Sequence, residues 1–167
     1  MKNYKMIVSY DGTRYFGWEH QPGKVLTIQG KLESVLEEMG AGEHPDTQKR
    51  KITVIGAGRT DAGVHARAMT CNVLLETEKT EEEIQAYMNR YLPDDIAVSE
   101  VKAVSDRFHA RYNAQGKTYE YTCFDGSVKP VFNRKYYTYL DAPVDEERMK
   151  EAAALLVGEH DFKTFRG

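Results

Sequence analysis

The sequence has little of what marks exported or membrane-bound proteins. Only two of its 167 residues are cysteine, Cys71 and Cys123, and neither stands in a CxxC or Cys/His spacing. Each lies in an alternating apolar stretch, so we expect reduced, packed thiols. The first eleven residues contain no apolar core of signal-peptide length, and no run of eighteen apolar residues occurs. We therefore expect a cytoplasmic location and no membrane segment.

The sequence also lacks an excess of either charge. Lys and Arg total 23 and Asp and Glu total 26, so the net charge is −3, which excludes a uniformly basic coat for nucleic acid. A polyanion would need a local basic patch. Residues 107–135 supply one, because only two acidic residues there accompany Arg107, Arg111, Lys117, Lys129, Arg134 and Lys135. This part of the chain is the predicted contact for phosphates.

The balance of 41% hydrophobic and 29% charged residues is that of an ordinary globular protein. Residue spacing predicts strands at 5–10, 52–55, 69–75 and 96–101, a helix at 28–39 capped by Thr27, and a helix that follows a capping box of Thr80 and Glu83. A loop at 41–51, with Pro45, joins the first helix to the second strand. This order predicts an α+β fold of the ferredoxin-like or RNA-recognition-motif type, with one antiparallel sheet and two helices on one face.

A second unit is predicted from residue 106 onward. Strands at 118–124 and 136–140 are followed by a helix for which Asp145 is the N-cap. That helix has too few partners to bury a face. We therefore divide the chain into a ferredoxin-like half with the candidate loop, residues 1–105, and an incomplete second α+β half, residues 106–167.

Residues 56–66, GAGRTDAGVHA, form a glycine-rich loop with a dense set of polar side chains. It is not a dinucleotide fingerprint, because Asp61 replaces the third glycine of GxGxxG and a strand follows where a helix should begin. Taken alone, Asp61 and Thr60 most simply form an Asx or Ser/Thr turn, which is closed by a side chain, and Arg59 pairs with a carboxylate. The chemical alternative is that Arg59 keeps Asp61 ionised for nucleophilic attack or proton abstraction.

Tyr119 is a second candidate residue. A period of two places it on one strand face with Tyr121 and Cys123, where an aromatic ring could stack on an unpaired base. A core or cross-strand tyrosine is an equally good interpretation, because the sequence contains 11 tyrosines.

The segment GRTDAGVHA, residues 58–66, resembles the signature of the TruA-type tRNA pseudouridine synthases. Further blocks resemble this family in the family's order, namely YDGT at 10–13, FGW at 16–18, TIQG at 27–30, LPDDI at 92–96, FHAR at 108–111, KTYEY at 117–121 and GEHDF at 158–162. They span nearly the whole chain. The sequence departs from the family pattern at Glu19, where glutamine is usual, and at Lys117 and Glu120, where arginine is common.

This resemblance implies an enzyme that isomerises uridine to pseudouridine in the tRNA anticodon arm, at positions 38 to 40, without cofactor or metal. Asp61 matches the family's essential aspartate, Arg59 the arginine that helps to hold the flipped-out nucleotide, and Tyr119 the tyrosine that stacks on the uracil. We assign further substrate-binding roles to His65, Arg111 and Lys117. The family fold joins two ferredoxin-like halves, usually in a homodimer.

Family members continue past the GEHDF block, so we expect the 167-residue chain to be a truncated form that is inactive alone. Two other functions stay open. A ferredoxin-like module could bind RNA without performing chemistry, and a glycosidase could use Asp11 and Asp61 as its two carboxylates. Turnover of uridine in a tRNA transcript separates the synthase from the binding module.

Overall fold

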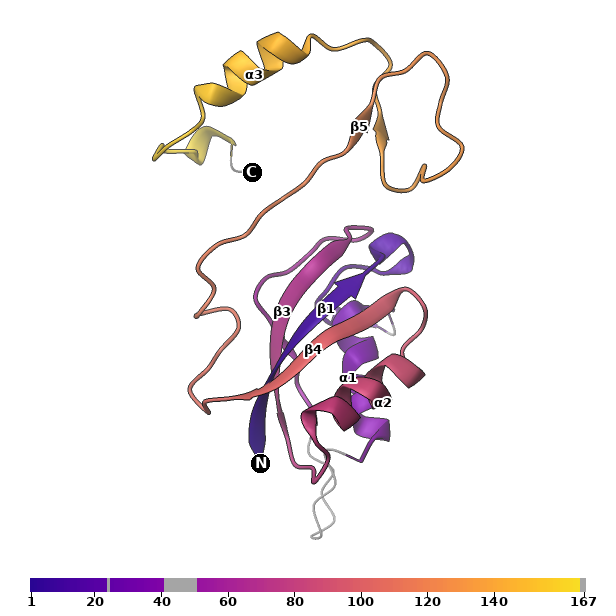
Figure 1. Cartoon of the computed structure of the whole chain (residues 1–167), viewed down its shortest axis with the longest axis vertical. Coiled ribbons are helices and arrows are strands. Elements are labelled where there is room, and N and C mark those ends of the chain that lie inside the picture. Colours follow the sequence, from indigo (N-terminus) through magenta and orange to yellow (C-terminus); the bar gives the residue numbers. More distant parts are fainter. Residues whose placement is uncertain (24, 41–50, 166–167) are drawn as a thin grey trace. The chain divides into compact units, whose positions relative to one another are not determined.

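The computed structural model describes residues 1–23, 25–40 and 51–165 (Figure 1). The chain divides into two compact units, Met1–Lys117 and Thr118–Gly167, and each is described by itself. Residues 41–50 of the loop predicted after the first helix, including Pro45, lie outside the described residues.

The first unit is a four-stranded antiparallel sheet with two helices on one face (Figure 1). Its strands are β1 (Lys2–Tyr10), β2 (Ile55–Gly56), β3 (Ala66–Leu75) and β4 (Ile96–Val104), and its helices are α1 (Ile28–Glu38) and α2 (Glu81–Tyr91). The strand order is β2-β3-β1-β4, so the central pair joins the first strand to the third. The predicted ferredoxin-like order is therefore confirmed.

The core of the first unit lies between the sheet and the two helices. Alternate side chains of β1, from Tyr4 to Tyr10, are buried and belong to one apolar cluster with Leu32 of α1 and Met88 of α2. This is the period-two pattern of a strand with one covered face. Tyr10, the last residue of β1, brings a phenol to the end of this face.

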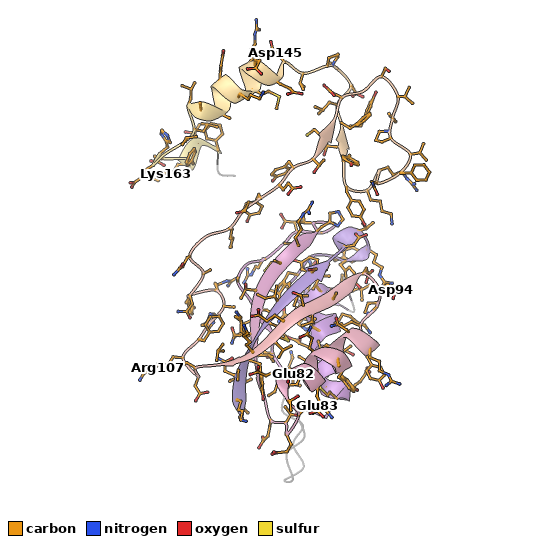
Figure 2. All side chains as sticks on the ribbon, viewed as in Figure 1. Glu82, Glu83, Asp94, Arg107, Asp145 and Lys163 are labelled. Atoms are coloured by element: carbon orange, nitrogen blue, oxygen red, sulfur yellow. The ribbon has the colours of Figure 1, made fainter. Side chains whose placement is uncertain are left out.

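Both helices begin at the predicted caps. Thr27 Oγ1 accepts a hydrogen bond from the backbone N–H of Gly30 at the start of α1. At the start of α2, Thr80 and Glu83 form the reciprocal capping box. Figure 2 labels Glu83 at this end of α2.

The second strand is shorter than predicted. The prediction covered residues 52–55, whereas β2 contains only Ile55 and Gly56. Ile52 and Val54 are nevertheless buried. The N–H of Val54 donates to Oε1 of the buried Glu33 on α1, at 2.8 Å, so a helix side chain takes the place of a strand partner there.

Each neighbour of β1 carries an irregularity close to the end of that strand. Val8 pairs with Met69 of β3, but Tyr10 pairs with Ala66, so two steps along β1 match three steps along β3. A second shift follows Ile7 in the pairing with β4. Extra residues of this kind are β-bulges, which change the direction of the side chains that follow them.

The first unit extends beyond the end of β4. The side-chain amide of Asn3 donates to the carbonyl oxygens of Ser105 and Phe108, and the N–H of Ala110 donates to Oδ1 of Asn72 at 2.8 Å. These bonds hold the segment after residue 105 against β1 and β3. The compact unit therefore ends later than the boundary expected at 105/106.

The second unit has little regular structure. Its elements are β5 (Cys123–Phe124), β6 (Thr138–Tyr139), α3 (Glu146–Ala154) and a 3-10 turn at Lys163–Phe165. The prediction of long strands at 118–124 and 136–140 was wrong, since only two residues of each pair, in parallel. Asp145 caps α3 as predicted, by accepting from the N–H of Arg148 (Figure 2).

None of the described residues of the second unit is buried. A two-residue ladder without a packed face cannot organise a longer strand. Cys123 is therefore exposed, which corrects the prediction that both thiols are packed. Cys71 on β3 is buried, as expected, and both cysteines are free thiols.

Candidate functional site

The glycine-rich loop occupies residues 57–65, because Gly56 ends β2 and Ala66 begins β3. Its backbone is tied to the β1–α1 loop, residues 11–27, by two hydrogen bonds. The N–H of Trp18 donates to the carbonyl of Thr60 at 3.0 Å, and the N–H of Gly63 donates to the carbonyl of Tyr15 at 3.1 Å. The loop is therefore anchored on both sides of Asp61.

Asp61 opens a tight turn. The N–H of Val64 donates to the Asp61 carbonyl at 3.2 Å, and Gly63 has a φ of +79°. A positive φ at this position is typical of a type II turn and favours glycine. The turn is thus closed by backbone atoms, whereas the sequence predicted closure by the side chains of Asp61 and Thr60.

The Asp61 side chain is exposed. Within the part of the chain that the structure describes, its carboxylate has no hydrogen bond or ion pair. A carboxylate that is held in place by its backbone and is not engaged by other side chains is available to a substrate.

Two glycines of the β1–α1 loop make close contact with this turn possible. A Cβ on Gly12 would lie 2.0 Å from the carbonyl oxygen of Val64, and one on Gly17 would lie 2.5 Å from that of Thr60. Gly17 also has a φ of +90°. The backbones of the YDGT and FGW blocks therefore pack directly against the backbone of the glycine-rich loop.

Arg59 pairs with Glu19, a partner that the sequence did not reveal. Arg59 Nη2 lies 2.8 Å from Glu19 Oε1, and both side chains are about half exposed. The guanidinium therefore faces the β1–α1 loop, and the carboxylate that it pairs with is Glu19 and not Asp61. The expectation that Arg59 pairs with a carboxylate is confirmed.

His65 fastens the end of the glycine-rich loop to the end of β1. The N–H of Gly12 donates to His65 Nδ1 at 3.1 Å, and Asp11 Oδ1 lies 3.0 Å from the same nitrogen. The same nitrogen accepts from Gly12 when it is unprotonated and donates to Asp11 when it carries a proton, so either form ties His65 to the end of β1. The geometry gives His65 a positioning role beside the substrate-binding role that we predicted.

Lys117 also lies at the glycine-rich loop. Its Nζ would be 2.7 Å from a Cβ on Gly58, so the ammonium group rests against the backbone next to Arg59. Arg111 is exposed and follows Ala110, which is anchored to β3 through Asn72. The structure therefore gathers Asp61, Arg59, His65 and Lys117 at one loop of the first unit.

Tyr119 belongs to the second unit, and the prediction of its secondary structure was wrong. It precedes β5 and is 68% exposed, and Tyr121 is also exposed. No strand face is therefore formed by Tyr119, Tyr121 and Cys123. Its stacking role stays a prediction.

Tyr10 is also a site residue, although the sequence analysis assigned it no role. Its hydroxyl lies 2.9 Å from Thr60 Oγ1, and burial raises the pKa of this phenol. The available signal was the alternation along β1, which places Tyr10 at the end of the buried face. Across residues 1–23, 25–40 and 51–165, no helix is long and apolar enough to cross a membrane, and no cluster of His, Cys, Asp or Glu forms a metal site.

The first unit is thus a ferredoxin-like α+β domain. Its glycine-rich loop, which is anchored through its backbone, presents the Asp61 carboxylate to the solvent as a candidate catalytic group. A family model described as tRNA pseudouridine synthase matches residues 6–113, which include this sheet and loop. The chain belongs to the tRNA pseudouridine synthase family.

Relatives of known description agree with this assignment. The chain is 47% identical to tRNA pseudouridine synthase A of Bacillus sp. (strain KSM-64) and 46% identical to tRNA pseudouridine synthase A 1 of Clostridium tetani (strain Massachusetts / E88), over 165 residues in each case. Each match covers 99% of this chain and 64% of the relative. The chain thus spans a little under two thirds of the length of these relatives.

Proposed function

We propose that this chain carries the catalytic loop of a tRNA pseudouridine synthase that isomerises uridine in the anticodon arm, at positions 38 to 40. The observation that carries the proposal is the Asp61 carboxylate, which is exposed and unengaged on a loop whose backbone is anchored. The family and the relatives described above support the reaction class.

In this reaction Asp61 acts on the ribose of a flipped-out uridine, as a nucleophile at C1′ or as a base at C2′. The bond from C1′ to N1 breaks, the uracil turns, and C1′ is joined to C5. The C5 proton is lost and N1 gains one, so the product is an isomer of the substrate and no cofactor or metal enters the balance.

The remaining roles follow the resemblance to the family, and the positions of Arg59, His65 and Lys117 at the glycine-rich loop support theirs. Arg59 and Lys117 flank the glycine-rich loop and bind the displaced nucleotide and its phosphates, and Arg111 extends this basic surface. His65 holds the loop, and Tyr119 stacks on the uracil, which offsets part of the cost of extruding the base. We place the enzyme in the cytoplasm and expect a homodimer.

The test is Asp61→Asn in a version of the protein extended to the full length of its relatives. We expect the loss of pseudouridine formation in a tRNA transcript, with tRNA affinity retained within a few-fold, because the amide keeps the size but cannot attack or deprotonate. Asp94→Asn, an exposed change on the first unit (Figure 2), is the matched control. Turnover by Asp61→Asn at the wild-type rate would remove Asp61 from the reaction. A wild-type protein that binds tRNA without turnover would be the non-catalytic RNA-binding module.

A further inference from the structure

We propose that Glu19 limits the affinity of this site for RNA by occupying Arg59 in the free protein, so that a substrate phosphate must displace the Glu19 carboxylate. This inference rests on the proposed function, in which Arg59 contacts the RNA. It assigns Glu19 the role of a specificity-determining residue that acts through Arg59.

The ion pair is well formed and open to the solvent. Arg59 Nη2 lies 2.8 Å from Glu19 Oε1, and the side chains are 57% and 46% exposed. A guanidinium group binds a carboxylate and a phosphate with the same N–H fork, so the two anions compete for one cation. An exposed pair of this kind is weak enough for a phosphate to displace it.

The backbone around Glu19 is fixed, unlike that of an ordinary surface glutamate. The N–H of Trp18 donates to the Thr60 carbonyl, and the carbonyl of Trp18 accepts from the N–H of Gln29 on α1 at 2.9 Å. On the other side, the N–H of His20 donates to Oε1 of Gln29 at 3.1 Å. Glu19 therefore lies between two anchored residues.

Anchoring of both neighbours fixes the backbone of Glu19, so only the rotamers of its own side chain must be ordered when it pairs with Arg59. The buried carboxylate of Glu33 reinforces this anchoring, because it binds the His20 ring and accepts a hydrogen bond from the side-chain amide of Gln29. An RNA that does not place a phosphate at Arg59 is repelled by the negative charge of Glu19 and forms no contact with the guanidinium group. The pair thus favours RNAs that present a phosphate at this one position.

The test is Glu19→Gln, which keeps the hydrogen bond to Arg59 but removes the competing charge. We expect the Kd for an unmodified tRNA transcript to fall about two- to fivefold at low salt, within the range of an exposed ion pair. The slope of log Kd against log salt should change by less than one phosphate contact contributes, about 0.7 on a single strand, because Arg59 reaches the phosphate in both proteins. Glu82→Gln, the same charge change at an exposed residue of α2 (Figure 2), should leave both quantities unchanged.

Two further measurements separate this proposal from its alternatives. In an Arg59→Gln background, Glu19→Gln should have no effect on Kd, which distinguishes release of Arg59 from a general change in net charge. Without RNA, the arginine reagent phenylglyoxal should modify Arg59 faster in Glu19→Gln than in Glu82→Gln, as measured by peptide mass spectrometry. This second measurement holds even if the wild-type protein fails to bind tRNA, a result that would contradict the proposed function alone. Equal Kd values and equal modification rates in the two variants, or weaker binding by Glu19→Gln, would overturn the inference.

Discussion

The hydroxyl of Tyr10 lies 2.9 Å from Oγ1 of Thr60, and this bond joins the last residue of β1 to the residue that precedes Asp61. Tyr10 is 5% exposed, and the centroid of its ring lies 6.0 Å from that of Trp18. The backbone N–H of Trp18 in turn donates to the Thr60 carbonyl. The hydroxyl and the carbonyl of Thr60 are therefore held by buried or anchored partners. Together they fix the direction in which the chain enters Asp61.

Tyr10→Phe in the extended protein should lower kcat about three- to tenfold and change KM by less than twofold, because one hydrogen bond of about 1 kcal/mol is lost behind the catalytic residue. Steady-state kinetics with a tRNA transcript measures this split. Tyr4→Phe, at another buried tyrosine of β1, is the control. Thr60→Val should not add to the effect of Tyr10→Phe, and full additivity would contradict a shared bond.

Gly12→Ala should destabilise the first unit by about 1–3 kcal/mol, the usual cost of forcing an atom into filled space. The new Cβ would lie 2.0 Å from the Val64 carbonyl oxygen, so the turn at Asp61 must shift. Gly116→Ala, where nothing lies within 4 Å, is the matched control. Urea unfolding of the two variants decides the matter, and equal midpoints would show that the contact is not required.

Acid should weaken the attachment of the β1–α1 loop to the segment after α2. Burial raises the pKa of Asp95, but the hydrogen bonds from Arg14 and Tyr15 outweigh it and hold the pKa below the ordinary 3.8. Because the folded value is the lower one, this stabilisation is present above about pH 4 and is lost as the pH falls through the folded pKa. Asp95→Asn should flatten the pH dependence of unfolding below pH 4, and an unchanged curve would contradict the assignment.

Replacement of Arg107, Arg111 and Lys117 by Gln should weaken tRNA binding and reduce its salt dependence, because each phosphate contact releases a counterion. Figure 2 shows Arg107 projecting beyond the end of β4. Lys79→Gln, at an exposed lysine before α2, serves as the control. The same slope of log Kd against log salt in the triple variant would place the RNA elsewhere.

The 167-residue chain should form no pseudouridine by itself, although Asp61, Arg59 and Tyr119 are all present. Asp61 is exposed, so water reaches the carboxylate at which the proposed reaction takes place. Charge that develops in water is stabilised less than charge in a closed site. Multiple turnover of a tRNA transcript by this chain would contradict the prediction.

The elements of the first unit were predicted well because helix caps and strand alternation depend only on residues that are close in the sequence. The caps at Thr27 and Thr80 and the alternation in β1 are contained in a few neighbouring residues. The ends of β2 were less predictable, since the partner of Val54 is a glutamate side chain on α1. In residues 118–122, two Thr and two Tyr around Glu120 favour a strand, but strand formation also needs a packed neighbour.

The candidate site shows the same limit. The motif singled out Asp61, and its glycine content indicated close backbone contacts. The Arg59 partner was not predictable from spacing, because Glu19 lies in a different loop and meets Arg59 only through the folding of the sheet. Charge alone allowed any carboxylate, including Asp61, to be the partner.

The bulge on β3 keeps Ala66 and Met69 opposite Tyr10 and Val8 of the core face, although β3 carries one residue more than β1 between these pairs. The extra residue lies between Ala66 and Met69, directly after the glycine-rich loop. Removal of Arg67 or Ala68 would leave Met69 opposite Val8 and every later pair of β3 unchanged. It would also leave Ala66 opposite Tyr10, but in a ladder without the bend and extra twist that the bulge gives to β3. A single deletion at this point would therefore straighten the strand that leaves the glycine-rich loop and re-aim the turn that carries Asp61, while the pairs of β3 beyond Met69 stay in place.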